Sequence, residues 1–295
     1  MRAEHCMLCP RRCGGGRTET AGTGVCRMGT QPVVARAAAH LWEEPCISGE
    51  KGSGTVFFSG CTLRCVFCQN REISAGGFGR PVTVERLREI YSALIAQGVH
   101  NINLVTPTHF APAVARSLRP ALPVPVVWNS SGYEAVETLR QLEGLVQIYL
   151  PDMKYAQESL AGRYSGAPDY PQAAKAAILE MYRQTGPYEL GEDGLLRRGT
   201  VIRHLILPGC LENTRMVIDW VAETFEPGQV LFSLMSQFTP TPACSAFPEL
   251  NRPLTQAEHD AACAYLMDSA IEDGFFQDPG SASESFIPPF DLTGV

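Results

Sequence analysis

The sequence predicts an α/β protein whose parallel strands form a partial (β/α)6 barrel that is open on one side. Six short apolar runs alternate with six stretches of helical pattern between residues 51 and 276, which is typical of a parallel sheet with covering helices. Each apolar run is followed by a polar loop punctuated by Gly, Pro or Ser. Six units are two short of a closed eight-stranded barrel, so right-handed crossovers would leave one side open to a large substrate.

The individual elements follow from periodicity and from helix start signals. The expected strands are residues 55–58, 101–105, 124–128, 146–150, 201–207 and 230–234. The expected helices are residues 83–97, 112–118, 134–142, 171–185, 213–224 and 255–272. Ser131 with Glu134 and Thr255 with Glu258 have the spacing of capping boxes, and Asn213 is an expected N-cap.

The segments that flank the barrel differ from it in composition. Residues 1–50 form a cysteine-rich N-terminal segment and an irregular connector, and residues 51–276 form the barrel. Residues 186–199 have the pattern of a hairpin or loop insertion. The tail, residues 277–295, lacks periodicity and is expected to run over the surface.

Length and charge restrict the class of protein. A chain of 295 residues that is 45% hydrophobic and 19% charged can bury one large core. The net charge of −7 and the pI near 5.4 argue against a nucleic-acid partner, which requires a clustered basic surface. No apolar run approaches the roughly 18 to 20 residues that cross a bilayer, and residues 1–30 lack the apolar stretch of a signal peptide. We therefore expect a cytoplasmic protein without a membrane partner.

Three cysteines follow the first expected strand with the spacing C-x3-C-x2-C. They are Cys61, Cys65 and Cys68. Three thiolates at this spacing can ligate three irons of a [4Fe-4S] cluster and leave the fourth iron open to another ligand. A structural zinc site would ordinarily take four protein ligands, and disulfides are disfavoured in the cytoplasm. The cluster is the favoured interpretation, with a zinc or purely structural role as the alternative.

A second group of cysteines lies near the N-terminus. Cys6, Cys9, Cys13 and Cys26, called the N-terminal quartet below, could supply four thiolates to zinc or to an iron–sulfur cluster. Nearby arginines, at positions 11, 12 and 17, would offset the negative charge of the thiolates. Free thiols are the alternative. The four remaining cysteines are expected to be buried and inert, and they are Cys46, Cys210, Cys244 and Cys263.

The three-cysteine loop, residues 61–68 with the aromatic Phe67 before its last cysteine, resembles the signature of the radical S-adenosylmethionine (SAM) superfamily. The surrounding run, residues 54–74, is similar to the branch that contains pyruvate formate-lyase activating enzyme and uncharacterised relatives. Asp152-Met153-Lys154 and the stretches 203–209 and 234–237 share that likeness. The resemblance implies a TIM-like partial barrel in which SAM chelates the open iron. One-electron reduction, by a donor such as flavodoxin or ferredoxin, then yields a 5′-deoxyadenosyl radical that abstracts hydrogen.

The resemblance also implies which residues contact SAM. They are Phe67, Thr106, Thr108, Asn129, Ser130, Ser131, Asp152, Lys154 and Gln237. The two threonines replace the Gly-Gly-Glu stretch of the family, so their hydroxyls would take over the contact with the methionine amino group. The short polar side chains at 129–131 suit the ribose, and Gln237 suits the adenosine. Ser131 as a helix cap, and Asp152 with Lys154 as a solvated ion pair, are the alternatives.

Three functions remain open at this stage. The first is activation of a glycyl radical enzyme, by abstraction of a glycine hydrogen from a partner protein. The second is radical modification of a small molecule or another macromolecule. The third is a metal-bound interaction or electron-carrier module, which would not consume SAM. No motif identifies the substrate, because the residues that contact it are dispersed over loops.

Overall fold

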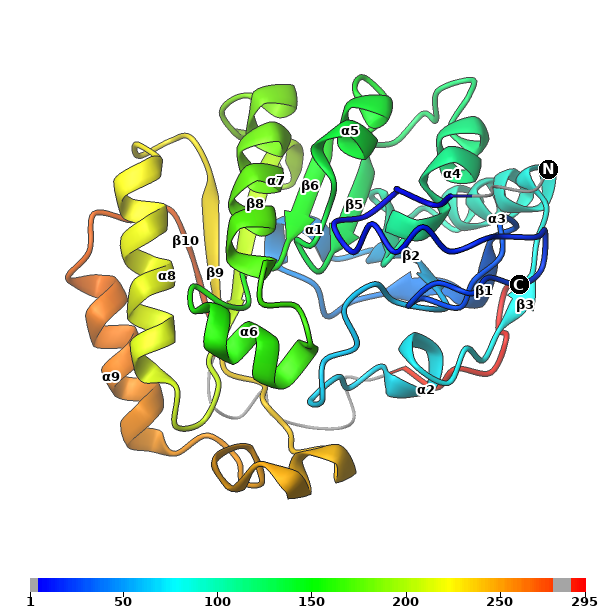
Figure 1. Ribbon diagram of the computed structural model, residues 1–295. Coiled ribbons are helices and arrows are strands. Elements are labelled where there is room, and N and C mark those ends of the chain that lie inside the picture. Colours follow the sequence, from blue (N-terminus) through cyan, green and yellow to red (C-terminus); the bar gives the residue numbers. More distant parts are fainter. Residues whose placement is uncertain (1–4, 278–287) are drawn as a thin grey trace.

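A mainly parallel sheet forms the centre of the molecule (Figure 1). The computed structural model describes residues 5–277 and 288–295. Within these residues the sheet has ten strands in the order β10-β9-β8-β6-β5-β4-β2-β1-β3, and β7 pairs with β8. All neighbours from β2 to β10 along this order are parallel, and among the described residues the two ends of the order do not pair. The expected open α/β architecture is confirmed.

The bounds of the elements are as follows. The strands are β1 (Val33–His40), β2 (Ser53–Phe58), β3 (Arg80–Pro81), β4 (Ile102–Val105), β5 (Val126–Ser130), β6 (Ile148–Pro151), β7 (Glu189–Leu190), β8 (Leu196–Leu205), β9 (Leu231–Met235) and β10 (Gly274–Phe276). The α-helices are α1 (Pro45–Ser48), α2 (Arg71–Ser74), α3 (Val84–Ala96), α4 (Ala111–Ser117), α5 (Val136–Leu139), α6 (Glu158–Ser165), α7 (Tyr170–Thr185), α8 (Leu211–Thr224) and α9 (Gln256–Met267). Short 3₁₀ turns are η1 (Thr108–Phe110), η2 (Arg140–Leu142), η3 (Pro242–Ala246) and η4 (Pro248–Leu250).

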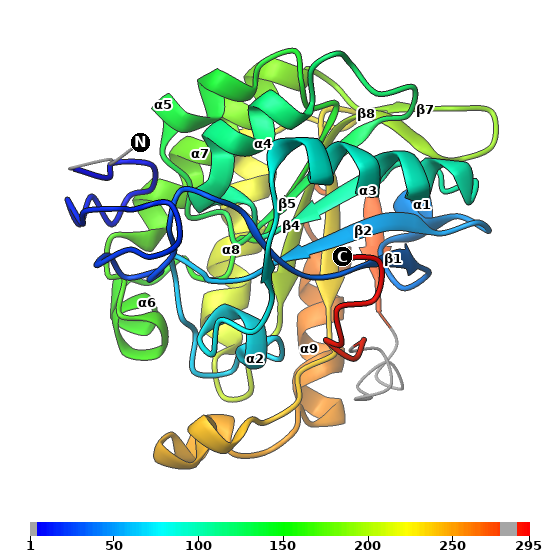
Figure 2. The ribbon, with the colours of Figure 1, turned by 90° about the vertical axis from the view of Figure 1, so that its right-hand side faces the viewer.

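The six expected strands correspond to β2, β4, β5, β6, β8 and β9. Every residue of β2, β4, β5, β6 and β9 is buried, as expected for parallel strands that are covered on both faces. Helices α3, α4, α7 and α8 lie along the outer face of the curved sheet (Figures 1 and 2). The predicted hairpin at 186–199 is also present, since β7 pairs antiparallel with β8.

The connector before the barrel is not irregular, and that expectation was wrong. It contains β1, which pairs antiparallel with β2 from Val34 to His40. Its sequence, VVARAAAH, is rich in alanine, which has little intrinsic preference for strands. Pairing with an already buried strand decides the conformation here, and local propensity does not.

The expected start signals gave one correct and two incorrect helix boundaries. Thr255 and Glu258 form the capping box at α9, with hydrogen bonds in both directions. Helix α5 begins only at Val136, so the predicted box of Ser131 with Glu134 is wrong. Glu134 is instead buried, and its carboxylate accepts hydrogen bonds from the side chains of Thr108 and Trp128.

The expected N-cap at Asn213 is also wrong, because α8 begins at Leu211. The Asn213 side chain accepts from the backbone N–H of Ala156 at 2.9 Å and donates to the carbonyl of Lys154 at 3.0 Å. It therefore fastens the loop after β6. Helix α6 was not predicted; its Tyr164 packs into the main apolar cluster, and this tertiary contact holds a sequence of modest helical propensity.

The end of the chain returns to the sheet. The Ala37 N–H donates to the Thr293 carbonyl at 2.8 Å, and the Leu292 N–H donates to the Ala35 carbonyl at 3.0 Å. Figure 2 shows the C-terminus beside β1. Residues 278–287 of the expected surface tail lie outside the described residues. No helix in the described part of the chain is long and apolar enough to cross a membrane.

Candidate active site at the carboxyl ends of the strands

A cavity lies where the parallel strands end, as the chemistry of parallel α/β folds requires. Except for Thr108, every residue that the sequence predicted to bind the cluster or SAM lines this cavity. The lining residues from that prediction are Cys61, Cys65, Phe67, Cys68, Thr106, Asn129, Ser130, Ser131, Asp152, Lys154 and Gln237. These residues come from loops that are up to 176 positions apart in the chain. The topology thus brings together side chains that the sequence placed separately.

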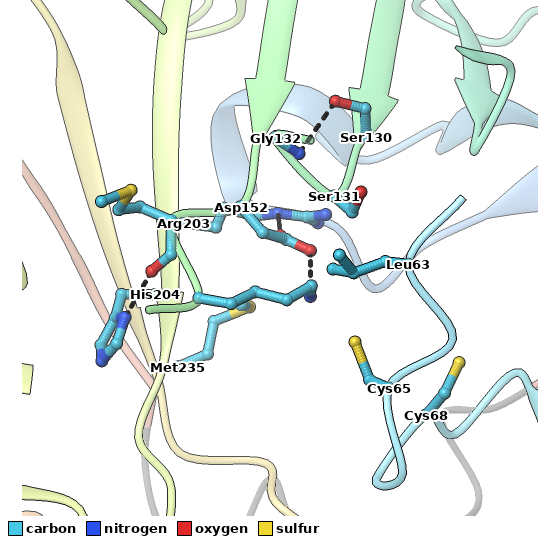
Figure 3. A network of polar contacts seen from close by, with 12 residues as sticks. Leu63, Cys65, Cys68, Ser130, Ser131, Gly132, Asp152, Arg203, His204 and Met235 are labelled. Atoms are coloured by element: carbon cyan, nitrogen blue, oxygen red, sulfur yellow. Dashed lines mark hydrogen bonds and ion pairs between the residues drawn. The ribbon is translucent and has the colours of Figure 1, made fainter. Parts of the chain in front are cut away.

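Each sulfur of the three-cysteine loop has a hydrogen-bonding neighbour. The Leu63 N–H donates to Cys61 at 3.4 Å, the Ser165 hydroxyl donates to Cys65 at 3.0 Å, and the Ser74 hydroxyl lies 3.3 Å from Cys68. Figure 3 shows the sulfur atoms of Cys65 and Cys68 on the side of the loop that faces Asp152. Hydrogen bonds of this kind orient metal-bound thiolates and adjust the redox potential of a cluster.

Burial disfavours the thiolate form of these cysteines unless a cation is nearby. It raises the pKa of Cys65 to about 12, with Lys154 acting in the opposite direction, and it also raises the pKa of Cys68. Iron would supply the missing positive charge. Within residues 5–277 and 288–295, no group of three or more His, Cys, Asp or Glu side chains is placed so that it could hold one metal ion. Three thiolates in one loop suit a cluster, whose cysteines bind different irons, better than a structural zinc ion, which takes four ligands.

Five charged and amide side chains form a polar network beside the loop. Asp152 accepts from Lys154 Nζ at 2.6 Å and from Arg203 Nε at 3.0 Å. Arg203 also donates to Glu43 at 3.1 Å and to Asn129 Oδ1 at 2.7 Å, and Asn129 Nδ2 donates to Glu43 at 3.2 Å. Burial acts to raise the pKa of Asp152, but Lys154 and Arg203 together hold it below its usual value. Asp152 is therefore an ionised carboxylate in a fixed orientation.

Sequence reasoning did not identify Glu43 or Arg203 as site residues. Arg203 carried a usable signal, because it follows two apolar residues in a strand, and a buried arginine is rarely without a partner. Glu43 carried none, since it belongs to the connector between β1 and α1, which was expected to be irregular. Its side chain is only 10% exposed. Burial raises its pKa, with Arg203 opposing this effect.

Hydrogen bonds within the protein already engage part of the polar loops that are expected to contact SAM. Ser130 Oγ accepts from the Gly132 N–H at 3.2 Å, which stabilises the turn after β5 (Figure 3). The Ser131 carbonyl accepts from the hydroxyl of Tyr170 at 2.9 Å. Gln69 Nε2 donates to the carbonyl of Gln237 at 2.8 Å, so the loop after β9 is tied to the end of the three-cysteine loop.

Arg64 is a further cavity residue that sequence reasoning missed. It stands between Cys61 and Cys65 with a φ of 62°, in the left-handed region that non-glycine residues rarely adopt. Its Nε is buried and has no hydrogen-bond partner among the described residues. A cation held in this way can meet an anionic group of a ligand in the cavity.

Thr106 and Thr108 have separate surroundings. Thr106 lines the cavity with a φ of 58°. Thr108 is buried behind it, where its hydroxyl donates to Glu134 at 2.6 Å, and Trp128 Nε1 donates to the same carboxylate oxygen at 3.2 Å. The second Glu134 oxygen lacks a hydrogen-bond partner of ordinary geometry in the described structure. Burial raises the pKa of Glu134 to about 7.

We expect Glu134 to make stability depend on pH. Its folded-state pKa lies above its ordinary value of 4.5, so its contribution is fully present below pH 4.5 and is lost as the pH rises through 7. The wild type should lose about 3 kcal/mol of unfolding free energy over this window relative to Glu134→Gln, which stays neutral. Urea denaturation at several pH values measures the difference. Glu137→Gln, at an exposed neighbouring position, is the control, and equal pH slopes for the wild type and Glu134→Gln would contradict the prediction.

The N-terminal quartet lies in a segment of hydrogen-bonded turns. The Cys6 N–H donates to the Gly15 carbonyl at 3.3 Å, and the Arg12 N–H donates to the Cys9 carbonyl at 3.0 Å. Burial raises the pKa of Cys9 to about 12, and the other three cysteines act in the same direction. The Arg17 guanidinium lies 3.8 Å from the Cys6 sulfur and donates to the Met28 carbonyl at 3.1 Å. Cys46, Cys210 and Cys244 are buried, and Cys263 is half-buried; none of these four lines the cavity.

Comparison with known proteins gives a match to one family. Residues 55–152 match the sequence profile of the Radical SAM superfamily. The chain is 28% identical to the uncharacterized protein MJ0674 of Methanocaldococcus jannaschii over 270 residues, which cover 88% of this chain and 73% of that protein.

Among solved structures, Streptococcus suis SuiB bound to S-adenosylmethionine has a TM-score of 0.46 at 10% identity, covering 74% of this chain and 48% of SuiB. SuiB bound to the precursor peptide SuiA has a TM-score of 0.47 at 11% identity, covering 74% of this chain and 47% of SuiB. The chain spans about half the length of these SuiB structures. The match to the Radical SAM superfamily rests on the profile of residues 55–152, which contain the three-cysteine loop.

Proposed function

We propose that the chain is a radical SAM enzyme that holds a [4Fe-4S] cluster at Cys61, Cys65 and Cys68 and cleaves SAM reductively. The observation that carries this proposal is that the three cysteines line the same cavity as Asp152 and Lys154. The family match covers the segment from before the three-cysteine loop to the end of β6. When bound, the cluster and SAM supply a one-electron cleavage that yields a 5′-deoxyadenosyl radical.

The chain's own residues would bind and orient SAM. Lys154 and the ionised Asp152 present opposite charges at the cavity wall, which suits the charged methionine end of SAM. Thr106 replaces the family's carboxylate contact, whereas Thr108 is committed to Glu134. Ser131 and Gln237 would contact the ribose and adenosine. The buried walls of the cavity would exclude water from the radical.

We further propose that the hydrogen donor is a glycine in a partner protein, as in glycyl radical enzyme activation. The open sheet supports this, because its end strands do not pair in the described part of the chain, and a sheet that does not close can admit a loop. A glycine has no side chain to block close approach, and the radical left on its Cα is delocalised over both flanking amides. The hydrogen atom ends on the 5′ carbon of 5′-deoxyadenosine, and flavodoxin or ferredoxin supplies the electron for SAM cleavage.

Electron paramagnetic resonance tests this assignment. The reconstituted enzyme, reduced and given SAM and candidate glycyl radical enzymes, is expected to produce a protein radical with a doublet signal. The doublet should collapse when the target glycine is deuterated at Cα. Formation of 5′-deoxyadenosine with a small metabolite, and no protein radical with any candidate, would favour radical modification of a small molecule instead. Absence of SAM consumption under strong reduction would favour an electron-carrier or interaction module.

We also propose that the N-terminal quartet binds a second metal, either zinc or an iron–sulfur cluster. The turns that hold these cysteines in one segment and the burial of Cys9 support this, because a buried thiol needs positive charge to ionise. The protein with Cys61, Cys65 and Cys68 all replaced by alanine should therefore retain metal, measured as zinc or as iron with sulfide. Complete loss of metal, with four titratable thiols in the quartet, would contradict the prediction.

A further inference from the structure

The side chain of Arg11 connects the N-terminal segment to the three-cysteine loop. Its Nε donates to the carbonyl of Thr62 at 2.9 Å, and its Nη2 donates to the carbonyls of Leu63 at 3.1 Å and Ser165 at 2.8 Å. Its Nη1 donates to the carbonyl of Gly166. The guanidinium also lies over the ring of Tyr133, 5.5 Å from its centroid. One side chain thus binds four backbone carbonyls from two distant segments.

These carbonyls belong to segments that hold the cluster ligands. Thr62 and Leu63 lie between Cys61 and Cys65, so Arg11 binds the backbone that sets the spacing of these two sulfurs. Ser165, whose carbonyl Arg11 also binds, donates its hydroxyl to the Cys65 sulfur at 3.0 Å. A displacement of Arg11 would therefore disturb two ligands and a hydrogen bond to one of them.

Arg11 lies in the same segment as the N-terminal quartet, between Cys9 and Cys13. The Arg12 N–H donates to the Cys9 carbonyl at 3.0 Å, which closes a turn that contains Arg11. The Leu8 carbonyl accepts from the Thr138 hydroxyl at 2.9 Å, which anchors the same turn to α5. Figure 2 shows the N-terminal segment running beside α5 and α6. The backbone of Arg11 thus lies in the turn that begins at Cys9, and its side chain contacts the three-cysteine loop.

We propose that Arg11 is a positioning residue through which the N-terminal quartet controls the three-cysteine loop. Metal bound at the quartet fixes the Cys9–Arg11 turn, and the guanidinium then holds the carbonyls between Cys61 and Cys65 in place. The inference rests on the proposed function, in that both cysteine groups bind metal. It assigns the N-terminal site a role in maintaining the active-site cluster, in addition to any stabilisation of its own segment.

The test uses the reconstituted full-length protein and reads the active-site cluster through the change that SAM produces in its electron paramagnetic resonance spectrum. Arg11→Ala is expected to weaken retention of the SAM-responsive cluster against a chelator by about tenfold or more. Arg86→Ala is the control, because Arg86 belongs to α3 and its side chain forms an exposed 2.8 Å ion pair with Glu89, and this variant should match the wild type. Cys6→Ala with Cys9→Ala should reproduce the loss with Arg11 present, and adding Arg11→Ala should then have little further effect.

Hydrogen–deuterium exchange of the peptide that contains residues 61–68 provides a second measurement, independent of turnover. Exchange should increase in Arg11→Ala and in the quartet variant, and remain unchanged in Arg86→Ala. If Arg11→Ala does not fold, Arg11→Lys keeps the charge but loses the planar fork, and it should show an intermediate loss. Wild-type retention and exchange in the Arg11 variants, or an unaffected SAM-responsive cluster in the quartet variant, would overturn the coupling. A wild type without any SAM-responsive cluster would instead overturn the proposed function.

Discussion

Replacement of Cys61, Cys65 and Cys68 together by alanine is expected to abolish SAM cleavage. The three side chains line one cavity, and each sulfur has a hydrogen-bonding neighbour that a metal-bound thiolate would use. Without thiolates no iron can be held at the loop, so the electron that breaks the C–S bond has no route to SAM. We expect no 5′-deoxyadenosine above background after strong reduction, measured by chromatography.

The control for this experiment is Cys263→Ala, because Cys263 is half-buried and lies outside the cavity. That variant should produce 5′-deoxyadenosine at the wild-type rate. Far-ultraviolet circular dichroism of both variants checks that the fold is preserved. Retained 5′-deoxyadenosine formation in the triple variant would show that the cluster is held elsewhere.

Removal of the Arg203 guanidinium is expected to cost about 3 to 5 kcal/mol of unfolding free energy. Arg203→Met keeps the length of the side chain but removes its hydrogen bonds to Glu43, Asp152 and Asn129. Asp152 retains Lys154, whereas Glu43 loses its cationic partner in a site where its side chain is 10% exposed. A buried carboxylate without a counter-charge is the main source of the loss.

Urea denaturation of single and double variants measures this contribution. Arg203→Met combined with Glu43→Gln should recover part of the loss, because the unpaired charge is then absent. Arg198→Met on the same strand is the matched control: Arg198 forms a 3.5 Å ion pair with Glu189, with side chains 48% and 62% exposed. Its effect should stay within about 0.5 kcal/mol. A loss below about 1 kcal/mol for Arg203→Met would mean that the network adds little to stability.

Local pattern was sufficient for the barrel strands because their physical cause is local. A run such as Ile102–Val105 can be stable only where both faces are covered, and the polar loop after it must lie at the carboxyl edge. The three-cysteine loop could also be predicted, since ligand type and spacing are properties of a short segment. The capping box at Thr255 was confirmed for the same reason.

Only the tertiary structure decided which distant side chains meet these local features. The alanine-rich β1 is a strand because β2 offers it hydrogen bonds, and the connector that follows carries Glu43 into the cavity. Glu134 forms no capping box because its carboxylate is held by Thr108 and Trp128. Arg11 reaches the three-cysteine loop across 52 positions of sequence. Such partners depend on how distant segments pack, and side-chain contacts between distant segments leave no periodicity in the sequence. Residue type and spacing alone, by contrast, predicted the sheet and the three-cysteine loop.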